Sequence, residues 1–304
     1  MLSRNMIQNI FYVYILAAGV LWGMIGLFFN HLTDLGLDRL QIMLLRVGIA
    51  AICLGIYIAI TNRDLFKIEL RDWWMFFGTG ICSLMFFNYC YFTCIAMVSV
   101  SVAAVLLYTA PMMVMVMSII LFKEKFTAKK GVVVLMTFAG CVMVTGLSSG
   151  NSIGAAGILV GLGAGFGYAL YSIFTTYALR KYHSITITFY TFVLAALGTL
   201  PLSHVTELAS MLSNPSVILN GIGLGVFACM FPYLLYTRGL TGVIASHASV
   251  MATVEPVVAT LIGVLVFNEA MTASKVSGII LILAGIVVLN VSAKKPLPKN
   301  SIIR

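Results

Sequence analysis

The sequence predicts an all-α membrane protein of ten transmembrane helices, arranged as two inverted five-helix repeats. Its composition is the first indication, because 61% of the 304 residues are hydrophobic and only 9% are charged, which is far from the composition of a soluble domain. Ten apolar segments approach the length of about 20 residues that a bilayer span requires. The two halves of the chain also match each other at a single offset.

The ten predicted spans divide evenly between the halves. Water is absent from the bilayer core, so each span satisfies its own backbone as a helix, and runs this long exclude barrel strands. In chain order, the predicted spans are Ile10–Asn30, Leu40–Ile60, Trp73–Ala96, Ser99–Phe122, Gly131–Leu147, Ala155–Ala178, Ile185–Leu202, Val217–Thr237, Val243–Phe267 and Val276–Val291.

The offset between the halves is 145 positions, which places Pro111 on Pro256, Glu124 on Glu269 and Tyr91 on Tyr236. The same shift superposes Thr127-Ala128 on Thr272-Ala273, Lys130 on Lys275 and Ala139-Gly140 on Ala284-Gly285. A tandem duplication explains this match. We therefore predict a first repeat at 1–147, a polar linker at 148–154, a second repeat at 155–292 and a cytoplasmic tail at 293–304.

Basic residues near span ends predict the orientation, because Lys and Arg are retained in the cytoplasm. With both termini inside, 15 of the 18 basic residues lie on the cytoplasmic side, Arg39 and Lys275 lie outside, and Arg46 lies within a span. Five spans per half is an odd number, so the second repeat enters the membrane inverted. Inverted repeats are the architecture of alternating-access transporters. The expected location is the bacterial cytoplasmic (inner) membrane.

A duplicated element runs from Thr109-Ala110-Pro111 to Lys123-Glu124 and again from Val254-Glu255-Pro256 to Asn268-Glu269, and Leu21-Trp22-Gly23 lies in the first span. By these features the sequence resembles the EamA-type members of the drug/metabolite transporter superfamily. The resemblance covers nearly the whole chain. It implies a ten-helix bundle in which the first four spans of each half surround a central cavity. The fifth spans are then peripheral, often near a dimer contact, so a homodimer is one expected assembly.

Glu255 is the only acidic residue deep in a predicted span. A charge there costs about 2.5–3.5 kcal/mol on insertion scales, so such residues face the bundle interior and serve function. Glu255 is a candidate for proton coupling or for binding a cationic group. The alternative is a structural carboxyl bonded to backbone groups that Pro256 frees. Its duplicate position is Ala110, so this chemistry belongs to one repeat.

Two further ionisable residues have competing interpretations. Arg46 either anchors the second span at the membrane surface, pairs with Glu255, or holds a substrate carboxylate. His247 lies two turns before Glu255, and it serves either as a proton relay or as a hydrogen-bonded interior group.

Aromatic residues recur at i and i+3, which places each pair on one helix face. These candidates for lining a cavity are Tyr168 with Tyr171, Tyr233 with Tyr236, and Asn88 with Tyr91, joined by Trp22 and Tyr108 if the family fold holds. Such walls suit amphipathic or cationic solutes. The alternative is the lipid-facing or interfacial position common for Tyr and Trp, which is the one we expect for Trp73-Trp74.

Glycine, proline and the duplicated glutamates have structural roles in our interpretation. The four-residue spacing of Gly157, Gly161 and Gly165, repeated at Gly221 and Gly225, favours close helix packing. Pro111 and Pro256 are the predicted hinges, with Pro232 a further kink. We expect Glu124 and Glu269 to cap helices or pair with lysine rather than bind substrate. The six cysteines lie in apolar runs and are expected to be buried.

The resulting hypothesis is a secondary transporter, with export the expected direction, that moves a small organic solute by alternating access. No P-loop motif is present, so ATP hydrolysis by this chain is not expected. We expect no enzyme activity, no metal, no cofactor and no nucleic-acid partner, only a small-molecule substrate, membrane lipids and protons. A zwitterion such as an amino acid suits Glu255 and Arg46 together. A broad exporter of cationic drugs or amines is the alternative, and an intramembrane enzyme or a channel is disfavoured.

The predicted orientation is tested by placing single cysteines at Ser149 and at Lys129. A membrane-impermeant thiol reagent added to intact cells should label the cysteine at 149, and it should label the cysteine at 129 only after permeabilisation. The opposite labelling pattern would reverse the orientation.

Overall fold

The computed structural model describes residues 4–146 and 154–291, and every regular element in these ranges is a helix. Ten helical spans within them are long and apolar enough to cross a membrane. Each begins and ends within a few residues of its predicted bounds. The tail predicted at 293–304 and all of the predicted linker except Gly154 lie outside the described residues.

Each repeat contributes five spans, several of them built from more than one helix. In the first repeat the spans are α1 (Arg4–Gly23) with α2 (Ile25–Asp34); α3 (Arg39–Thr61); α4 (Trp73–Phe77) with α5 (Phe86–Met97); α6 (Val100–Leu107) with α7 (Ala110–Phe122); and α8 (Ala128–Thr145). In the second they are α9 (Ala155–Ala178); α10 (Ser184–Thr199); α12 (Pro215–Ile222) with α13 (Phe231–Gly239); α14 (Ala245–Met251) with α15 (Val254–Val266); and α16 (Ala273–Val291). The short helix α11 (Val205–Met211) lies outside the spans.

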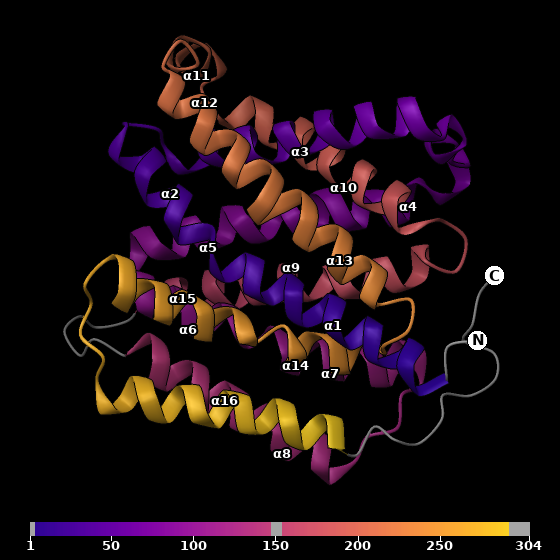
Figure 1. The fold of residues 1–304 in the computed structure, drawn as a ribbon, viewed down its shortest axis with the longest axis vertical. Coiled ribbons are helices and arrows are strands. Elements are labelled where there is room, and N and C mark those ends of the chain that lie inside the picture. The colour runs from indigo at the N-terminus through magenta and orange to yellow at the C-terminus, as the bar shows by residue number, and fades with distance from the viewer. Residues whose placement is uncertain (1–3, 147–153, 292–304) are drawn as a thin grey trace.

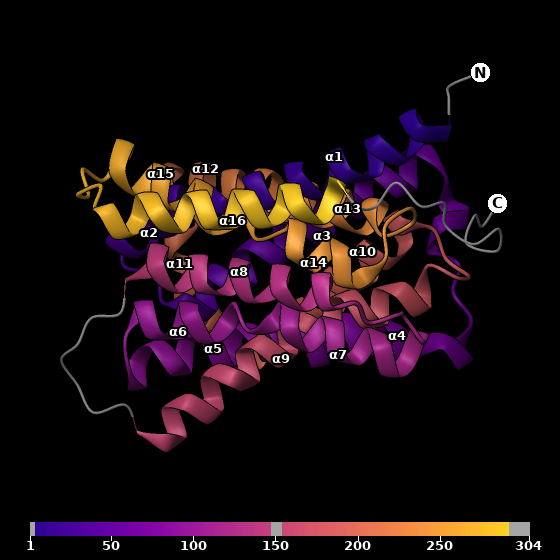
Figure 2. The same ribbon diagram turned by 90° about the horizontal axis from the view of Figure 1, so that it is seen from below.

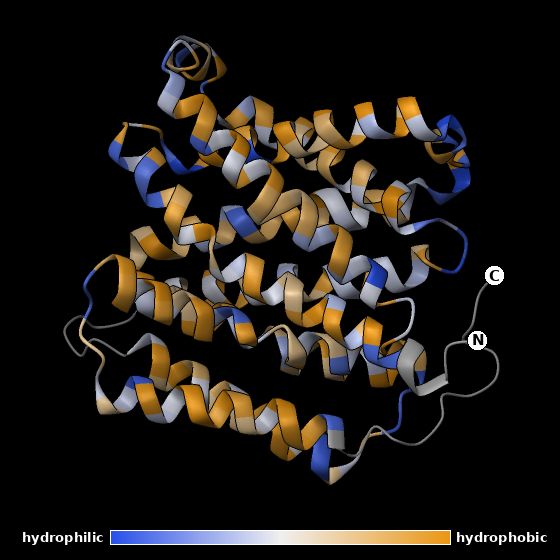
Figure 3. Ribbon diagram, in the orientation of Figure 1, coloured by the Kyte–Doolittle hydropathy of each residue, from blue (hydrophilic) through white to orange (hydrophobic). Residues whose placement is uncertain are grey.

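The two repeats run through the bundle in opposite directions. Helix α1 begins near the N-terminus at the right of Figure 2, whereas α9 begins at the left and runs toward the right. We call the end where α7 ends and α8 begins the basic end, because Lys123, Lys130, Lys181 and Arg238 lie in or beside its loops. We call the other end of the bundle, where α6 begins and α15 ends, the opposite end. Hydrophilic residues gather at these two ends, and apolar residues cover the helices between them (Figure 3).

Spans four and nine are interrupted at equivalent points by the predicted hinge prolines. Proline has no backbone N–H, so the carbonyl four residues earlier loses its usual partner. Before each proline, a backbone N–H instead bonds the carbonyl three residues earlier, from Thr109 N to the Leu106 oxygen (3.2 Å) and from Thr253 N to the Val250 oxygen (3.1 Å). Helices α7 and α15 then restart with proline in their first turn, at the second residue of α7 and the third residue of α15.

Spans three and eight each contain a π-helical segment, Gly78–Met85 and Gly223–Met230, which the sequence analysis did not predict. The two segments are equivalent under the 145-residue shift, and each packs tightly on a neighbouring helix. A Cβ atom at Gly80 would lie 3.0 Å from the Thr191 oxygen of α10, and one at Gly225 would lie 3.1 Å from the Arg46 oxygen of α3. Glycine therefore permits these backbones to approach.

The fifth spans, α8 and α16, pack against each other along one edge of the bundle (Figure 1). Gly140 and Gly278 face each other there, and a Cβ atom on Gly278 would lie 2.7 Å from the Gly140 oxygen. The predicted glycine packing holds elsewhere as well. A Cβ atom on Gly161 or Gly165 would lie within 3 Å of Leu106 in α6 or of Thr109.

Gly278→Ala tests the packing of α8 on α16. The methyl group forces the two backbones apart, so we expect a loss of about 1–3 kcal/mol in stability, the cost of overpacking. Thermal unfolding of the purified protein in detergent measures this. Gly48→Ala is the matched control, because no atom lies within 4 Å of a Cβ atom at that helical position. Equal melting temperatures for the two variants would contradict the proposed packing.

Candidate functional site

An aromatic pocket lies at the centre of the bundle, between spans from both repeats. Trp22 of α1 is 6% exposed, and its ring lies 5.2 Å from that of Tyr233 and 5.3 Å from that of Tyr236, measured between centroids. Tyr168 and Tyr171 of α9 complete the aromatic wall. The residues that line this small pocket are Trp22, Ser83, Phe87, Tyr168, Tyr171, Ser172, Tyr233 and Tyr236.

Hydrogen bonds between spans six and eight hold these rings in place. The hydroxyls of Tyr171 and Thr237 lie 2.7 Å apart, as do those of Ser172 and Tyr236. Buried hydroxyls that are paired in this way carry no desolvation penalty and fix the orientation of their side chains. The aromatic wall is therefore preorganised.

A second small pocket lies where the two broken spans meet. Tyr108, Ala110 and Pro111 come from the break in span four, and Ser249, Ala252, Thr253 and Glu255 come from the break in span nine. Leu107 and Tyr168 complete its lining, so Tyr168 borders both pockets. Both predicted hinges thus lie beside this pocket, Pro111 in its wall and Pro256 next to Glu255.

Glu255 is partly accessible in this second pocket, in the first turn of α15. Its carboxylate accepts a long hydrogen bond of 3.4 Å from the Tyr168 hydroxyl. Gly23 explains how α1 approaches this turn, since a Cβ atom on Gly23 would lie 2.8 Å from the Glu255 backbone oxygen. The Leu21-Trp22-Gly23 motif therefore brings Trp22 to the aromatic pocket and α1 to Glu255.

Arg46 of α3 lies inside the bundle and is 7% exposed. One of its terminal nitrogens donates a 3.2 Å hydrogen bond to the Asn88 side-chain oxygen, while its Nε has no hydrogen-bond partner. Asn88 is itself fixed by a 2.7 Å bond from its amide nitrogen to the Leu84 oxygen. Among the described residues, Arg46 and Glu255 form no ion pair within 4.0 Å.

The structure brings some of the predicted site residues together and separates others. Trp22, Tyr108, Tyr168, Tyr171, Tyr233, Tyr236 and Glu255 line one or both pockets. Arg46, Asn88, Tyr91 and His247 line neither. Buried Nε2 of His247 has no hydrogen-bond partner, and the Tyr91 ring lies beside that of Phe92, with centroids 6.1 Å apart.

Sequence reasoning missed eight lining residues, all small or apolar: Ser83, Phe87, Leu107, Ala110, Ser172, Ser249, Ala252 and Thr253. Ser172 was within reach, because it lies four residues after Tyr168 and therefore on the same helix face. Ser83 and Phe87 have the same spacing. Nothing in the sequence distinguishes such hydroxyls from those that only bond their own backbone.

The EamA-like transporter family model matches residues 9–146 and again residues 155–291. The chain belongs to the EamA-like transporter family. It is thus an integral membrane transporter of the drug/metabolite transporter superfamily, with a small-molecule substrate, and not an enzyme.

Known proteins similar to this EamA-like transporter agree with that assignment. The uncharacterized transporter YwfM of Bacillus subtilis is 25% identical over 292 residues, covering 94% of this chain and 96% of its own. An uncharacterized transporter of Archaeoglobus fulgidus is 30% identical over 250 residues, covering 82% of this chain and 88% of its own. A solved crystal structure superposes with a TM-score of 0.80 at 18% identity, covering 92% of this chain and 96% of that one, which supports the fold alone.

Asn88→Leu tests the role of Asn88 in holding Arg46. The variant leaves a buried guanidinium without its side-chain partner, so we expect stability to fall by about 1–3 kcal/mol in thermal unfolding. Asn220→Leu is the matched control, because Asn220 makes the same bond to the carbonyl four residues earlier (2.8 Å to the Ser216 oxygen) and holds no cation. An equally large loss in both variants would exclude the Arg46 contact as the cause.

Proposed function

We propose that this transporter is a secondary carrier that exports small zwitterions such as amino acids. The observation that carries this proposal is the presence of two opposite charges near the aromatic pocket that do not pair with each other. Glu255 lines the second pocket, and Arg46 is bonded to Asn88, whose neighbour Phe87 lines the aromatic pocket. Within the described part of the chain Arg46 and Glu255 form no ion pair, and each retains unused hydrogen-bonding capacity.

An unpaired charge inside a membrane protein is costly unless a partner compensates for it. A zwitterion supplies both partners at once, its ammonium to Glu255 and its carboxylate to Arg46. Tyr168 borders both pockets and contacts Glu255, so it lies between the aromatic pocket and the second pocket. The aromatic wall suits the apolar side chain of such a solute.

The transport cycle that fits these repeats is alternating access around the two pockets, with the interrupted spans four and nine as the bending elements. We infer that Glu255 also couples the cycle to protons, because it is the one carboxylate that lines either pocket. The charge pattern supports a bacterial cytoplasmic membrane protein with both termini in the cytoplasm. The paired α8 and α16 at the edge of the bundle support a homodimer contact there.

Binding of amino acids to purified protein tests the substrate class. A ligand at about 100 times its Kd stabilises the folded state by about 2.7 kcal/mol. We expect neutral amino acids to raise the melting temperature of the wild type and of Asp34→Asn, an exposed acidic control, but not that of Glu255→Gln. Stabilisation by quaternary amines alone would instead support a broad cation exporter.

Transport of the stabilising solute into proteoliposomes forms the second arm of this test. We expect an imposed pH gradient to drive uptake by the wild type. Glu255→Gln should lose this dependence on the gradient even at solute concentrations that saturate binding. Gradient-driven uptake by Glu255→Gln would remove Glu255 from proton coupling.

A further inference from the structure

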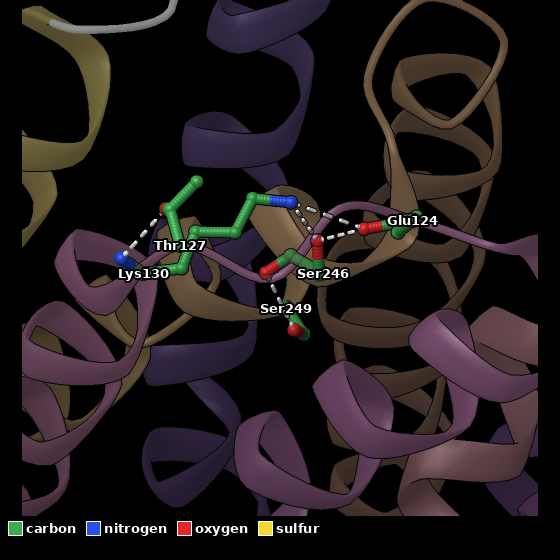
Figure 4. A network of polar contacts seen from close by, with 5 residues as sticks. All are labelled: Glu124, Thr127, Lys130, Ser246 and Ser249. Atoms are coloured by element: carbon green, nitrogen blue, oxygen red, sulfur yellow. Dashed lines mark hydrogen bonds and ion pairs between the residues drawn. The ribbon is translucent and has the colours of Figure 1, made fainter.

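A polar cluster outside both pockets joins the two repeats at the basic end (Figure 4). Ser246 of α14 donates a short hydrogen bond to Glu124, which follows α7. Lys130 of α8 lies 3.4 Å from both the Ser246 hydroxyl and the Glu124 carboxylate. The cluster is well shielded, since Ser246 is 3% exposed and the Glu124 side chain 9%.

This cluster lies where the broken spans close against each other. Helix α7 packs side by side with α14 at the basic end. A second connection between the repeats lies at the same end, where Lys181 Nζ is 2.6 Å from a carboxylate oxygen of Asp72 and of Glu69. The hydrogen bonds to these carboxylates, Asp72 first, raise the pKa of Lys181, so it remains charged. The basic end is therefore closed.

The residues of this cluster occur twice in the chain. The 145-residue shift places Glu124 on Glu269, Lys130 on Lys275 and Ser246 on Ser101. The second glutamate and lysine form their own ion pair at the opposite end, with Lys275 Nζ 2.8 Å from the Glu269 carboxylate.

The backbone that carries the two glutamates is also the same. Lys123 and Asn268, the residues before them, adopt the left-handed conformation with φ of 54° and 55°. Each glutamate N–H then bonds the carbonyl six residues earlier, at 3.2 Å for Glu124 and 3.0 Å for Glu269. This helix-ending motif positions both carboxylates in the same way relative to their helices.

The third member of the second cluster is not in place. Glu269 hydrogen-bonds with Lys275 but not with Ser101, and its side chain is 54% exposed, against 9% for Glu124. Helices α6 and α15, the equivalents of α14 and α7, lie apart in Figure 2 and do not pack together as that pair does. The equivalent cluster at the opposite end is therefore incomplete in this structure.

We propose that Ser101, Glu269 and Lys275 form a second gate, which closes the opposite end when the basic end opens. Helix α15 then moves onto α6, Ser101 donates to Glu269, and Ser246 releases Glu124. Both Glu–Lys ion pairs lie within one repeat and persist, so within the duplicated clusters only the serine contacts exchange. The Lys181 contacts to Asp72 and Glu69 are a further connection of the closed basic end. The inference rests on the alternating-access cycle proposed above, because inverted repeats exchange conformations in such a cycle.

Within the duplicated clusters, the exchange is balanced. Each conformation has one serine bonded to a glutamate, and the hydrogen bond lost at one end is replaced by the one gained at the other. A small difference between states allows a solute to shift the population by its own differential binding. The duplicated cluster thus supplies a switch with little energetic bias.

Disulfide cross-linking tests the second gate in protein whose six cysteines are replaced by alanine. The pair Ser246→Cys with Glu124→Cys should cross-link rapidly in liposomes. The pair Ser101→Cys with Glu269→Cys should also cross-link, because cysteines join only where their Cα atoms approach within about 7 Å. Adding Ser246→Ala should raise the cross-linking rate of the Ser101→Cys with Glu269→Cys pair about tenfold, because the closed basic end then loses one hydrogen bond to a charged group. Ser101→Cys with Phe126→Cys, at opposite ends of the bundle, measures the intermolecular background.

A charge variant provides an independent measurement. Glu269→Gln should raise the cross-linking rate of the Ser246→Cys with Glu124→Cys pair, because it weakens the state in which the basic end is open. Glu207→Gln, an exposed acidic residue that lies near Gln41 at the same opposite end, should leave that rate unchanged. A merely structural Glu269 would not shift the rate in this direction.

Failure of the gate and failure of the proposed transport function give different results. A Ser101 and Glu269 cysteine pair that never cross-links above background, in protein that still transports its solute, overturns the gate alone. Cross-linking that responds to Ser246→Ala, in protein that binds no zwitterion, supports the gate and overturns the substrate assignment.

Discussion

Proline in spans four and nine interrupts backbone hydrogen bonding where no water is present to replace it, and the rest of the structure depends on this constraint. Non-helical backbone is tolerated at membrane depth only where protein or a cavity surrounds it. Here α1 and α9 approach closely at glycine positions and cover the two breaks, with Gly23 against Glu255 and Gly165 against Thr109. The breaks therefore lie at the centre of the bundle, where the second pocket forms between them.

The duplication supplies the proposed transport cycle with two related arrangements of the same elements. Equivalent elements have the same local geometry, as the helix endings before Glu124 and Glu269 show, but different surroundings. In the proposed cycle, inverted repeats of this kind exchange these surroundings. The paired α8 and α16 pack along one edge of the bundle, where they contact the helices of the broken spans.

Much of this fold could be predicted from the sequence, because the signals are long. Apolar runs define the ten spans, and the 145-residue shift defines the repeats and the equivalent proline breaks in spans four and nine. Of the residues at i and i+3, the four tyrosines of α9 and α13 line the pockets, and Asn88 and Tyr91 do not. The π-helical segments were missed, since no residue type specifies an extra backbone residue in a helix, although Gly78 and Gly80 recur as Gly223 and Gly225. The positions of Arg46 and His247 relative to the pockets depend on packing between distant spans, which periodicity within one span does not encode.

The residues proposed to bind solute are not duplicated, whereas the residues proposed to move in the transport cycle are. Glu255 corresponds to Ala110 and Arg46 to Thr191, so the residues proposed to bind solute occur once. The residues proposed as gates occur in both repeats. A binding site has no need to be symmetric, because one solute occupies it in both conformations. Gates must match in strength, since an imbalance would hold the carrier in one state.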